Sequence, residues 1–461
     1  MNPFNRTIAA VSTPRGKGGI AVIRISGSDA VSVASRMFRS KLNLSEYPAR
    51  SAVYGEILSS EDEVIDTGIA VIYRAPASFT GEDVVEISCH GGVSVTLETL
   101  MSAIAHGAVS AMAGEFTKRA FVNGKLSLTE AEAVGRLIDA DTKERMLLAG
   151  GAARGNVSSR IEELSAGLFD VMTALYAAID YPEEDVGDEG ERMIGEVLRG
   201  TLHGVNELLS TYRVGRAVSD GVKCAVCGRP NVGKSSLFNC MTGEESSIVT
   251  DIAGTTRDIL RETVSFGGVT LRISDTAGIR DSDDAVEKIG VERAMGEICS
   301  AELIIAVFDG SERLTEADYE LLESVKSAPG EKITVINKTD AGCGLTEAEE
   351  EKIKEASGKI VRISAANNDV RELENEVARL FGSDKISLGH DAVIWDARQR
   401  EILLRARSFL EAAVGAVENG DALDAICTMA EEALAALNET DGRGINESIV
   451  NEVFSRFCVG K

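Results

Sequence analysis

A glycine-rich segment near the middle of the chain has the residue pattern of a phosphate-binding loop. Residues 228–236 read GRPNVGKSS and fit G-x-x-x-x-G-K-S, between a predicted strand (VKCAVCG) and a predicted helix (SLFNCMTG). Glycines let backbone N–H groups close around phosphate oxygens, and the helix N-terminus adds its dipole. We therefore expect Lys234 to reach the β- and γ-phosphates of a nucleotide and the Ser235 hydroxyl to bind Mg²⁺.

Three further motifs follow predicted strands and indicate which nucleotide is bound. The DTAG motif, Asp275–Gly278, follows TLRIS, where an acid can hold Mg²⁺ through water and a glycine N–H can sense the γ-phosphate. The NKTD motif ends in Asp340, whose carboxylate can accept two hydrogen bonds from guanine that adenine does not offer. Ser364 and Ala365 fit the loop that contacts the base carbonyl. Because these motifs occur in order at strand ends, the sequence predicts a guanine-nucleotide site.

A fourth loop lies between the first two strands of this region and reads GTTRD from Gly254 to Asp258. A threonine in such a switch loop can complete the Mg²⁺ shell when the γ-phosphate is present, and we assign this role to Thr256. The predicted nucleotide contacts lie in these loops and in the four residues that precede Gly254. They are Asn231, Val232, Gly233, Lys234, Ser235, Ser236, Thr250, Asp251, Ile252, Ala253, Gly254, Thr255, Thr256, Asp275, Thr276, Ala277, Gly278, Asn337, Lys338, Asp340, Ser364 and Ala365.

The group that positions the attacking water is not fixed by these motifs. Ras-like enzymes use a glutamine directly after the DTAG motif, whereas this chain has Ile279, which cannot polarise water. Asn231, inside the phosphate loop, has a side-chain oxygen that could bind a monovalent cation beside the phosphates, or it could be a variable loop residue. The acidic candidates for positioning water are Asp281, Asp283, Asp284 and Glu287.

Composition limits the class of protein. The 461 residues include 48 Lys+Arg and 74 Asp+Glu, a net charge of −26, so most of the surface should repel nucleic acid. A local basic patch or a partner must then bind any polynucleotide. No apolar run approaches the roughly 20 residues of a membrane helix, and the N-terminus lacks a secretion signal, so we expect a cytoplasmic protein. Cys224 and Cys227 form a C-x-x-C, but VKCAVC reads as a buried strand rather than a zinc site.

The scaffold that positions these motifs changes along the chain. Residues 1–125 alternate short β-type runs with glycine-rich turns and predict an α+β domain. Residues 126–215 and 383–461 repeat apolar residues every three to four positions and predict two parts of one helical domain. Residues 216–382 alternate apolar strands with helices, which predicts a doubly wound, mostly parallel sheet. We expect a Ras-like α/β P-loop GTPase domain inserted in an all-α domain and preceded by the α+β domain.

Three segments outside the nucleotide motifs resemble the MnmE (TrmE) family of bacterial and organellar tRNA-modification GTPases, within the TrmE-Era-like class. They are PASFTGEDVVEISCHGG at 76–92, GEFTKRAFVNGKLSLTEAEAVGRLIDA at 114–140 and the C-terminal FCVGK at 457–461. The order of domains agrees, and the resemblance covers essentially the whole chain. It implies a folate-binding N-terminal domain, a split helical domain and an inserted GTPase domain.

The resemblance also implies roles for particular residues. Asn231 would bind K⁺ together with backbone groups of Thr250, Ile252 and Thr255, in place of an arginine finger. Glu287 falls where the family has its water-orienting carboxylate, while Ser235 and Thr256 match the Mg²⁺ positions. The matching folate-binding positions are Arg24, Glu86, Lys125 and Lys461, and Cys458 matches a family cysteine near that pocket, as a possible functional thiol.

The function implied by the resemblance is GTP hydrolysis, stimulated by K⁺, that serves C5 modification of the wobble uridine (position 34) in certain tRNAs. The product carries an aminomethyl or carboxymethylaminomethyl group, and the one-carbon donor is 5-formyl- or 5,10-methylene-tetrahydrofolate. The implied partners are a second copy of the chain and an MnmG-type flavoprotein, together a heterotetramer in which the flavoprotein grips most of the tRNA.

Two other classes of function fit parts of the sequence. An Era-like GTP switch in ribosome assembly or translation explains residues 221–382 equally well, but it explains neither the tail nor the N-terminal domain, and it needs a basic RNA-binding appendage that the sequence does not offer. A membrane-linked GTPase is disfavoured because the sequence shows no anchor and no basic amphipathic helix.

Overall fold

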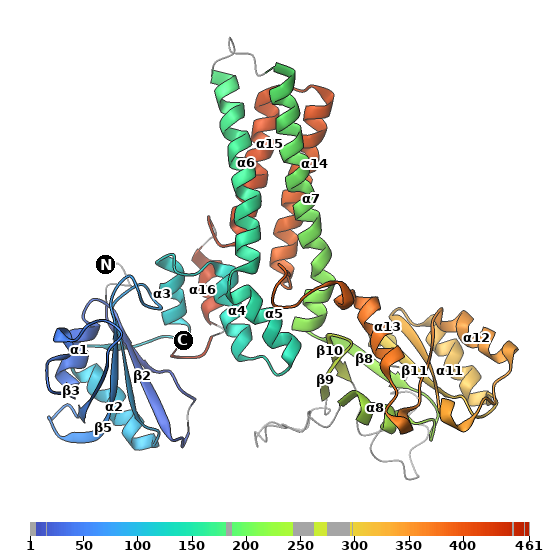
Figure 1. Cartoon of the computed structure of the whole chain (residues 1–461), viewed down its shortest axis with the longest axis horizontal. Coiled ribbons are helices and arrows are strands. Elements are labelled where there is room, and N and C mark those ends of the chain that lie inside the picture. The colour runs from blue at the N-terminus through green and yellow to red at the C-terminus, as the bar shows by residue number, and fades with distance from the viewer. Residues whose placement is uncertain are drawn as a thin grey trace. The chain divides into compact units, whose positions relative to one another are not determined.

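The computed structural model describes residues 6–14, 16–180, 187–242, 262–273, 296, 298–444, 447–455 and 457–460. It divides into two compact units. The first consists of Met1–Gly135 with Leu434–Lys461, and the second is Arg136–Ala433. Each unit is described by itself, and Figure 1 identifies their elements by label and colour.

The N-terminal part of the first unit is an α+β domain, as the sequence predicts. Its described residues form a seven-stranded sheet in the order β3-β4-β5-β6-β2-β1-β7, antiparallel except for β1 beside β7. The strands are β1 (Ile8–Val11), β2 (Ile20–Ser26), β3 (Phe38–Arg39), β4 (Ala52–Leu58), β5 (Val64–Tyr73), β6 (Val84–His90) and β7 (Val109–Ser110). The helices are α1 (Ala30–Met37), η1 (Leu44–Glu46) and α2 (Val93–Ala105).

Successive side chains of β2 point to opposite faces of this sheet. Ala21, Ile23 and Ile25 are buried in the core with residues of α1. The residues between them point to the opposite face because side chains alternate along a strand. Arg24 therefore lies on that opposite face, directly across from Glu86 in the β2–β6 pairing.

The C-terminal residues of the chain pack into the same unit. The Gly114 N–H donates to the carbonyl of Cys458 at 3.3 Å, and the Ser12 hydroxyl donates to the Gly460 carbonyl at 3.0 Å. The ring of Phe457 packs against that of Phe454 in a tilted arrangement, with 5.4 Å between ring centroids. The tail motif and the N-terminal domain, at opposite ends of the sequence, are thus neighbours. The helices here are α3 (Glu115–Val122), α4 (Leu128–Ile138) and α16 (Glu447–Ser455).

The second unit contains a helical bundle and a sheet. In Figure 1, α6, α7, α14 and α15 lie side by side, although the sheet separates the first two from the last two in sequence. This confirms that the sheet domain is inserted into a helical domain. The three domain boundaries predicted from the sequence stay predictions. The helices are α5 (Lys143–Ala153), α6 (Asn156–Asp180), α7 (Gly187–Ser219), α14 (Ala397–Asn419) and α15 (Leu423–Thr440).

The described part of the inserted sheet has six strands in the order β13-β12-β11-β8-β10-β9, all parallel except the edge strand β9. All seven residues of β11 are buried, as expected for a parallel strand covered on both faces. The strands are β8 (Val222–Cys227), β9 (Glu262–Phe266), β10 (Val269–Ile273), β11 (Leu303–Asp309), β12 (Glu331–Asn337) and β13 (Ile360–Arg362). The helices are α8 (Lys234–Thr242), α11 (Glu316–Ser327), η2 (Thr339–Ala341), α12 (Glu347–Ser357), η3 (Ala365–Asn367), α13 (Arg371–Phe381) and η4 (Ser383–Lys385).

Helix α7 leads directly into the sheet and is bonded to it. The Thr270 hydroxyl of β10 donates to the Val218 carbonyl at 2.9 Å, and Arg213 pairs with Glu331 at 2.6 Å. Glu331 begins β12, so these contacts lie at the amino ends of the strands. The opposite, carboxyl ends are left for the loops that carry the nucleotide motifs.

The C-x-x-C pair lies in β8, as the sequence predicts for a buried strand. Cys224 and Cys227 are both buried, and burial raises the pKa of the Cys227 thiol to about 12. Such thiols stay protonated and are poor metal ligands. The described residues contain no cluster of His, Cys, Asp or Glu suited to a metal ion.

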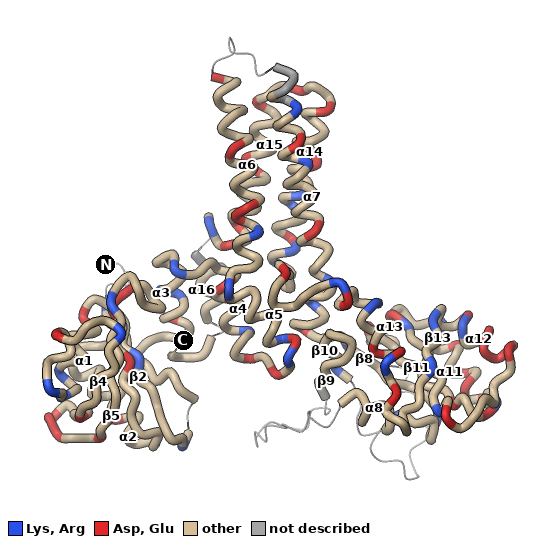
Figure 2. Tube along the Cα trace, viewed as in Figure 1, with Lys and Arg blue, Asp and Glu red and all other residues tan. Residues whose placement is uncertain are grey.

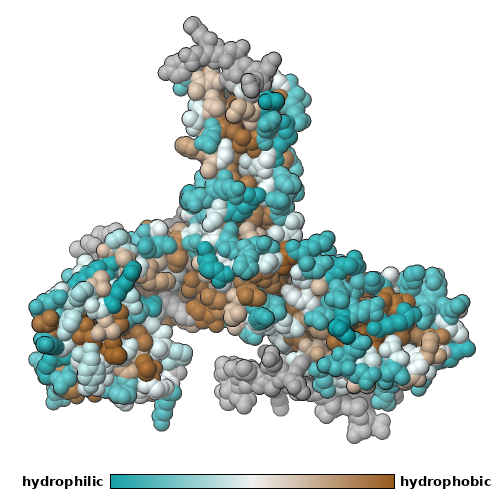
Figure 3. Space-filling model, in the orientation of Figure 1, coloured by the Kyte–Doolittle hydropathy of each residue, from teal (hydrophilic) through white to brown (hydrophobic). Residues whose placement is uncertain are grey.

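The surface is mixed in charge, with local apolar exposure. In Figure 2, Lys and Arg positions are interspersed with Asp and Glu along the bundle and around the inserted sheet. In Figure 3, apolar side chains are visible on the face of the N-terminal domain where α2 lies. Val93, Leu97 and Met101, spaced by four residues on α2, are 59%, 54% and 51% exposed. Among the described helices, every one is too short or too polar to cross a bilayer.

Candidate nucleotide-binding site

The phosphate loop connects the end of β8 to the start of α8, and its glycines are required by close packing. A Cβ added at Gly228 would lie 2.5 Å from the carbonyl oxygen of Val307 in β11. At Gly233 it would lie 2.2 Å from the side-chain nitrogen of Asn337, and φ there is +98°. Asn231 also has a left-handed backbone, with φ of +66°, a region that asparagine and glycine enter most readily. The loop conformation thus follows from its sequence.

Lys234 is held over this loop by the loop's own carbonyls. Its ammonium donates to the Gly228 carbonyl at 2.8 Å and to the Arg229 carbonyl at 2.9 Å. Burial lowers the pKa of Lys234, because desolvation disfavours the charged form. A phosphate oxygen offers this partly desolvated ammonium a stronger, charge-assisted acceptor than a carbonyl does. Ser235 and Ser236, in the first turn of α8, are exposed.

Asn337 joins the phosphate loop to the loop of Ser364 and Ala365. Its side chain is buried; the amide nitrogen donates to the Val232 carbonyl at 2.9 Å, and the amide oxygen accepts from the Ala365 N–H at 3.0 Å. The ends of β8, β12 and β13 are therefore fixed to one another by a single side chain.

The carboxylate predicted to read the base is oriented by the next loop. Asp340 is exposed, and its Oδ1 accepts from the Ser364 hydroxyl at 2.5 Å. The Thr339 hydroxyl donates to the Ile363 carbonyl at 3.0 Å, which ties the same two loops by a second contact. The neighbouring Lys338 has φ of +62°, and its ammonium meets Asp309 at 2.6 Å.

The structure therefore brings together the predicted contacts that it describes, from residues 231–236, 337–340 and 364–365. β10 ends at Ile273, beside β8, two residues before the DTAG motif. The other predicted contacts lie outside the described residues and stay predictions. They are Thr250, Asp251, Ile252, Ala253, Gly254, Thr255, Thr256, Asp275, Thr276, Ala277, Gly278, Glu287 and the folate-site residue Lys461.

Three ion pairs at this site were not anticipated from the sequence. Arg229, in the phosphate loop, pairs with Glu312 and Asp318, and Lys338 pairs with Asp309. Burial alone would raise the pKa of the Asp309 carboxyl, but hydrogen bonds from Lys338 and Ser311 outweigh it and hold that pKa below its ordinary value. Arg229 and Lys338 belong to the sequence motifs, but their acidic partners lie in residues 309–318, which only the fold brings close to them.

A second candidate site lies on the face of the N-terminal sheet opposite to α1. The Arg24 guanidinium pairs with Glu86 at 2.8 Å and lies 5.5 and 5.6 Å from the ring centres of Phe79 and Phe116. Lys125 is exposed, and its stem lies close to Gly81 in the loop that precedes β6. The first two predicted folate-site residues are thus in contact, and Lys125 borders the same loop.

A buried charge network beside these residues was missed by sequence reasoning. Arg119 is 1% exposed and binds Glu82 at 2.9 Å and Glu115 at 2.9 Å, while the Ser26 hydroxyl donates to Glu82 at 2.8 Å. Glu82 and Arg119 lie within the two longer resemblance motifs, which is the signal that could have found them. Cys458 is exposed on the tail.

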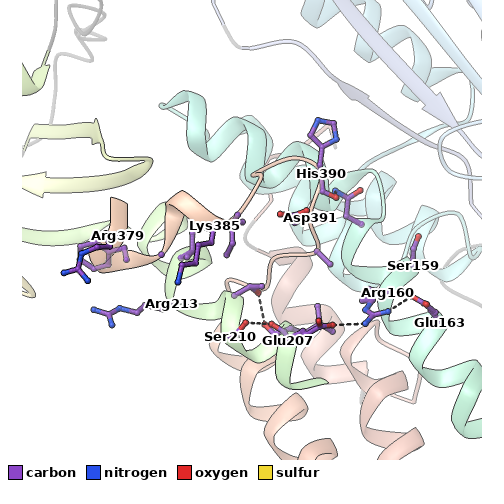
Figure 4. A pocket seen from close by; sticks show the side chains of 18 of the residues that line it. Ser159, Arg160, Glu163, Glu207, Ser210, Arg213, Arg379, Lys385, His390 and Asp391 are labelled. Carbon is purple, nitrogen blue, oxygen red and sulfur yellow. Dashed lines mark hydrogen bonds and ion pairs between the residues drawn. The ribbon is translucent and has the colours of Figure 1, made fainter. Parts of the chain in front are cut away.

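An open groove of about 1010 Å³ lies elsewhere in the second unit, along α6, α7 and residues 379–392 (Figure 4). Arg160 in it pairs with Glu163 at 2.6 Å and Glu207 at 3.1 Å. The groove also includes Arg213, whose partner Glu331 begins β12, whereas Asn337 ends that strand. Seven residues of strand span about 20 Å, so the groove is separate from the nucleotide loops.

Known proteins match this chain over almost its whole length. Two family models match: the GTP-binding protein TrmE N-terminus over residues 7–125 and the MnmE helical domain over residues 128–458. A tRNA modification GTPase MnmE from Lactobacillus delbrueckii subsp. bulgaricus is 40% identical over 99% of this chain and 98% of its own length. MnmE proteins from Lactobacillus helveticus and Thermoanaerobacter pseudethanolicus are each 38% identical, over 99% of this chain and 98% and 99% of their own lengths.

Replacing the base-reading carboxylate tests the nucleotide site. Asp340→Asn should weaken GDP binding at least about tenfold, because an amide N–H₂ then faces guanine's own donors. Binding of xanthosine diphosphate should improve, since its C2 carbonyl accepts from that amide. Titration of both nucleotides measures this. Ser364→Ala is the matched control: it removes the hydroxyl but keeps the carboxylate, so selectivity for guanine should remain. Unchanged selectivity in Asp340→Asn would show that another residue reads the base.

Proposed function

The chain belongs to the MnmE family of tRNA modification GTPases, and we propose that its GTP hydrolysis drives C5 modification of the wobble uridine in certain tRNAs. The product carries an aminomethyl or carboxymethylaminomethyl group. The observation that carries the proposal is the site in which Asn337 joins the phosphate loop to the loop of Ser364 and Ala365. An Era-like switch shares that site but gives no role to the tail packed into the N-terminal unit.

We propose that Mg²⁺ and K⁺ serve hydrolysis. The side-chain and backbone oxygens of the residues proposed to bind these ions are hydroxyl, amide and carbonyl oxygens, which suit hard cations. Ser235 and Thr256 hold Mg²⁺, and Asn231 with backbone groups of Thr250, Ile252 and Thr255 holds K⁺. Asn231 is exposed in a left-handed turn of the phosphate loop, which supports its side chain being available. Bound K⁺ supplies the positive charge that an arginine finger gives other GTPases.

The chain's own groups then complete the catalytic arrangement. Lys234 exchanges its two carbonyl partners for phosphate oxygens and stabilises the charge that develops on them. Glu287 orients the attacking water in place of the glutamine of Ras-like enzymes. Arg229, in the phosphate loop, is not free to act as an arginine finger, because its side chain pairs with two carboxylates.

The N-terminal domain is proposed to bind the one-carbon donor, 5-formyl- or 5,10-methylene-tetrahydrofolate. Arg24, Glu86, Lys125 and Lys461 form the site. Support comes from Glu86, since a carboxylate suits the N–H donors of a planar heterocycle, and from Phe79, which lies beside Arg24 and is 39% exposed. Cations suit the donor's glutamate tail. Cys458, on the neighbouring tail, is the candidate thiol of this site.

Two partners follow from this function. A second copy of the chain forms a homodimer, and the exposed apolar stripe of Val93, Leu97 and Met101 supports such an interface. An MnmG-type flavoprotein completes a heterotetramer in the cytoplasm and supplies most of the contact to tRNA. The net charge of −26 supports that division, because an acidic chain repels the tRNA backbone.

Potassium dependence tests the hydrolytic site. GTP turnover should be at least about tenfold faster in KCl than in NaCl, since a bound cation replaces the arginine finger. Asn231→Gly tolerates the left-handed backbone and removes only the amide, so it should lose most of the K⁺ advantage while GDP affinity changes little. Steady-state phosphate release in both salts measures this. Equal rates for the unchanged protein in the two salts would remove the cation from the proposal.

Mass analysis of wobble uridine tests the cellular role. Cells that lack this protein should accumulate tRNAs without the C5 group, and the unchanged chain should restore it. Lys234→Ala should fail to restore it, because the phosphate contact is lost while the N-terminal domain is untouched. Immunoblotting controls for the amount of each variant. Full modification in cells that lack the protein would contradict the proposed function.

A further inference from the structure

The side chain of Arg229 leaves the phosphate loop and binds two carboxylates near the start of α11. Its Nη2 lies 2.7 Å from Glu312 Oε2, and its Nε lies 3.3 Å from Asp318 Oδ2. The Arg229 side chain is 22% exposed and that of Asp318 is 3% exposed. The guanidinium is thus largely enclosed and paired with two carboxylates.

Asp318 is a fixed anchor for this arginine. Its Oδ2 accepts from both the backbone N–H of Thr315 at 2.9 Å and the Thr315 hydroxyl at 2.8 Å, the capping box at the N-terminus of α11. A buried carboxylate in a helix cap has little freedom to move. Arg229 therefore ties the phosphate loop to a rigid helix start rather than to a mobile side chain.

The same residue also carries one of the carbonyls that hold Lys234. The Arg229 carbonyl accepts from the Lys234 ammonium at 2.9 Å. At the other end of this segment, Asp309 accepts from Lys338 of the base-reading motif at 2.6 Å. Residues 309–318 thus hold one residue from the phosphate loop and one from the base loop by ion pairs.

We propose that Arg229 is a positioning residue of the nucleotide site, whose pairs with Asp318 and Glu312 keep the phosphate loop in its binding conformation and slow nucleotide release. The inference rests on the proposed assignment of residues 228–236 as the phosphate loop. A loop that is already ordered loses less conformational entropy on binding, so the bound state is favoured. Removing the arginine leaves the buried Asp318 carboxylate without a cation and breaks the link between the phosphate loop and the start of α11.

The experiment compares Arg229→Ala with Arg379→Ala in the full chain. Arg379 makes a pair of similar length with a buried carboxylate, Nη2 to Glu376 Oε1 at 2.6 Å, on α13 away from the loops. Release of fluorescent GDP is followed by stopped flow, with thermal melting and GTP turnover measured in parallel. Arg229→Ala should release GDP about tenfold faster and raise KM for GTP more than it lowers kcat, whereas Arg379→Ala should release GDP as the unchanged chain does.

A second set of variants separates positioning from folding. Glu312→Gln with Asp318→Asn removes both negative charges but keeps side-chain size and the oxygen that caps α11, and it should speed GDP release as Arg229→Ala does. Adding Arg229→Ala to that pair should produce no further effect, because the contact is already lost. If Arg229→Ala does not fold, the rate of GDP release from the Glu312→Gln, Asp318→Asn protein tests the inference by itself.

Two results would overturn the inference. One is GDP release from the folded variants at the rate of the unchanged chain. The other is an equal acceleration in Arg379→Ala, which would mean that any lost ion pair loosens the domain. Failure of the unchanged chain to bind GDP at all would instead refute the proposed nucleotide site, so the two claims fail separately.

Discussion

One buried amide, that of Asn337, makes a single site out of three strand ends. A parallel sheet brings the carboxyl ends of β8, β12 and β13 to the same edge, but it does not by itself bring their loops within bonding distance. Asn337 does so by donating to the Val232 carbonyl and accepting from the Ala365 N–H. Gly233 permits this approach, since any Cβ there would overlap the Asn337 amide. This bridge therefore sets the distance between the phosphate loop and the loop that begins at Ser364.

Other contacts in the second unit hold the same loops and strands in place. Residues 309–318 support both loops through Arg229 and Lys338. Helix α7 binds β10 through Val218 at the amino ends of the strands, and β10 ends two residues before the DTAG motif. Strand β10 thus links the last turn of α7, through the Thr270 hydroxyl, to the residues that lead into the DTAG motif. In the other unit, the tail packs against the N-terminal domain, and the Arg24–Glu86 pair of that domain lies beside two aromatic rings.

The sequence was sufficient for the fold class, and the order of the strand-end motifs implied that their described residues meet at one edge of the sheet. Their contacts to a nucleotide stay predictions. The sequence was not sufficient for the ion pairs. Arg229 and Glu312 lie 83 positions apart, and Arg119 and Glu82 lie 37 apart. Neither periodicity nor spacing links such residues; their proximity depends on how the elements pack. The hydrolytic residues are a different case: Thr256 and Glu287 lie outside the described residues, so their assignment rests on the resemblance.

The most direct test of the shared site is a crystal structure of the full chain with a non-hydrolysable GTP analogue, Mg²⁺ and K⁺. The account predicts guanine bonded to Asp340 and to the Ala365 loop, phosphates enclosed by residues 231–236, and the Asn337 amide still bridging Val232 and Ala365. A nucleotide bound elsewhere, or bound between these loops with the Asn337 bridge broken, would contradict it.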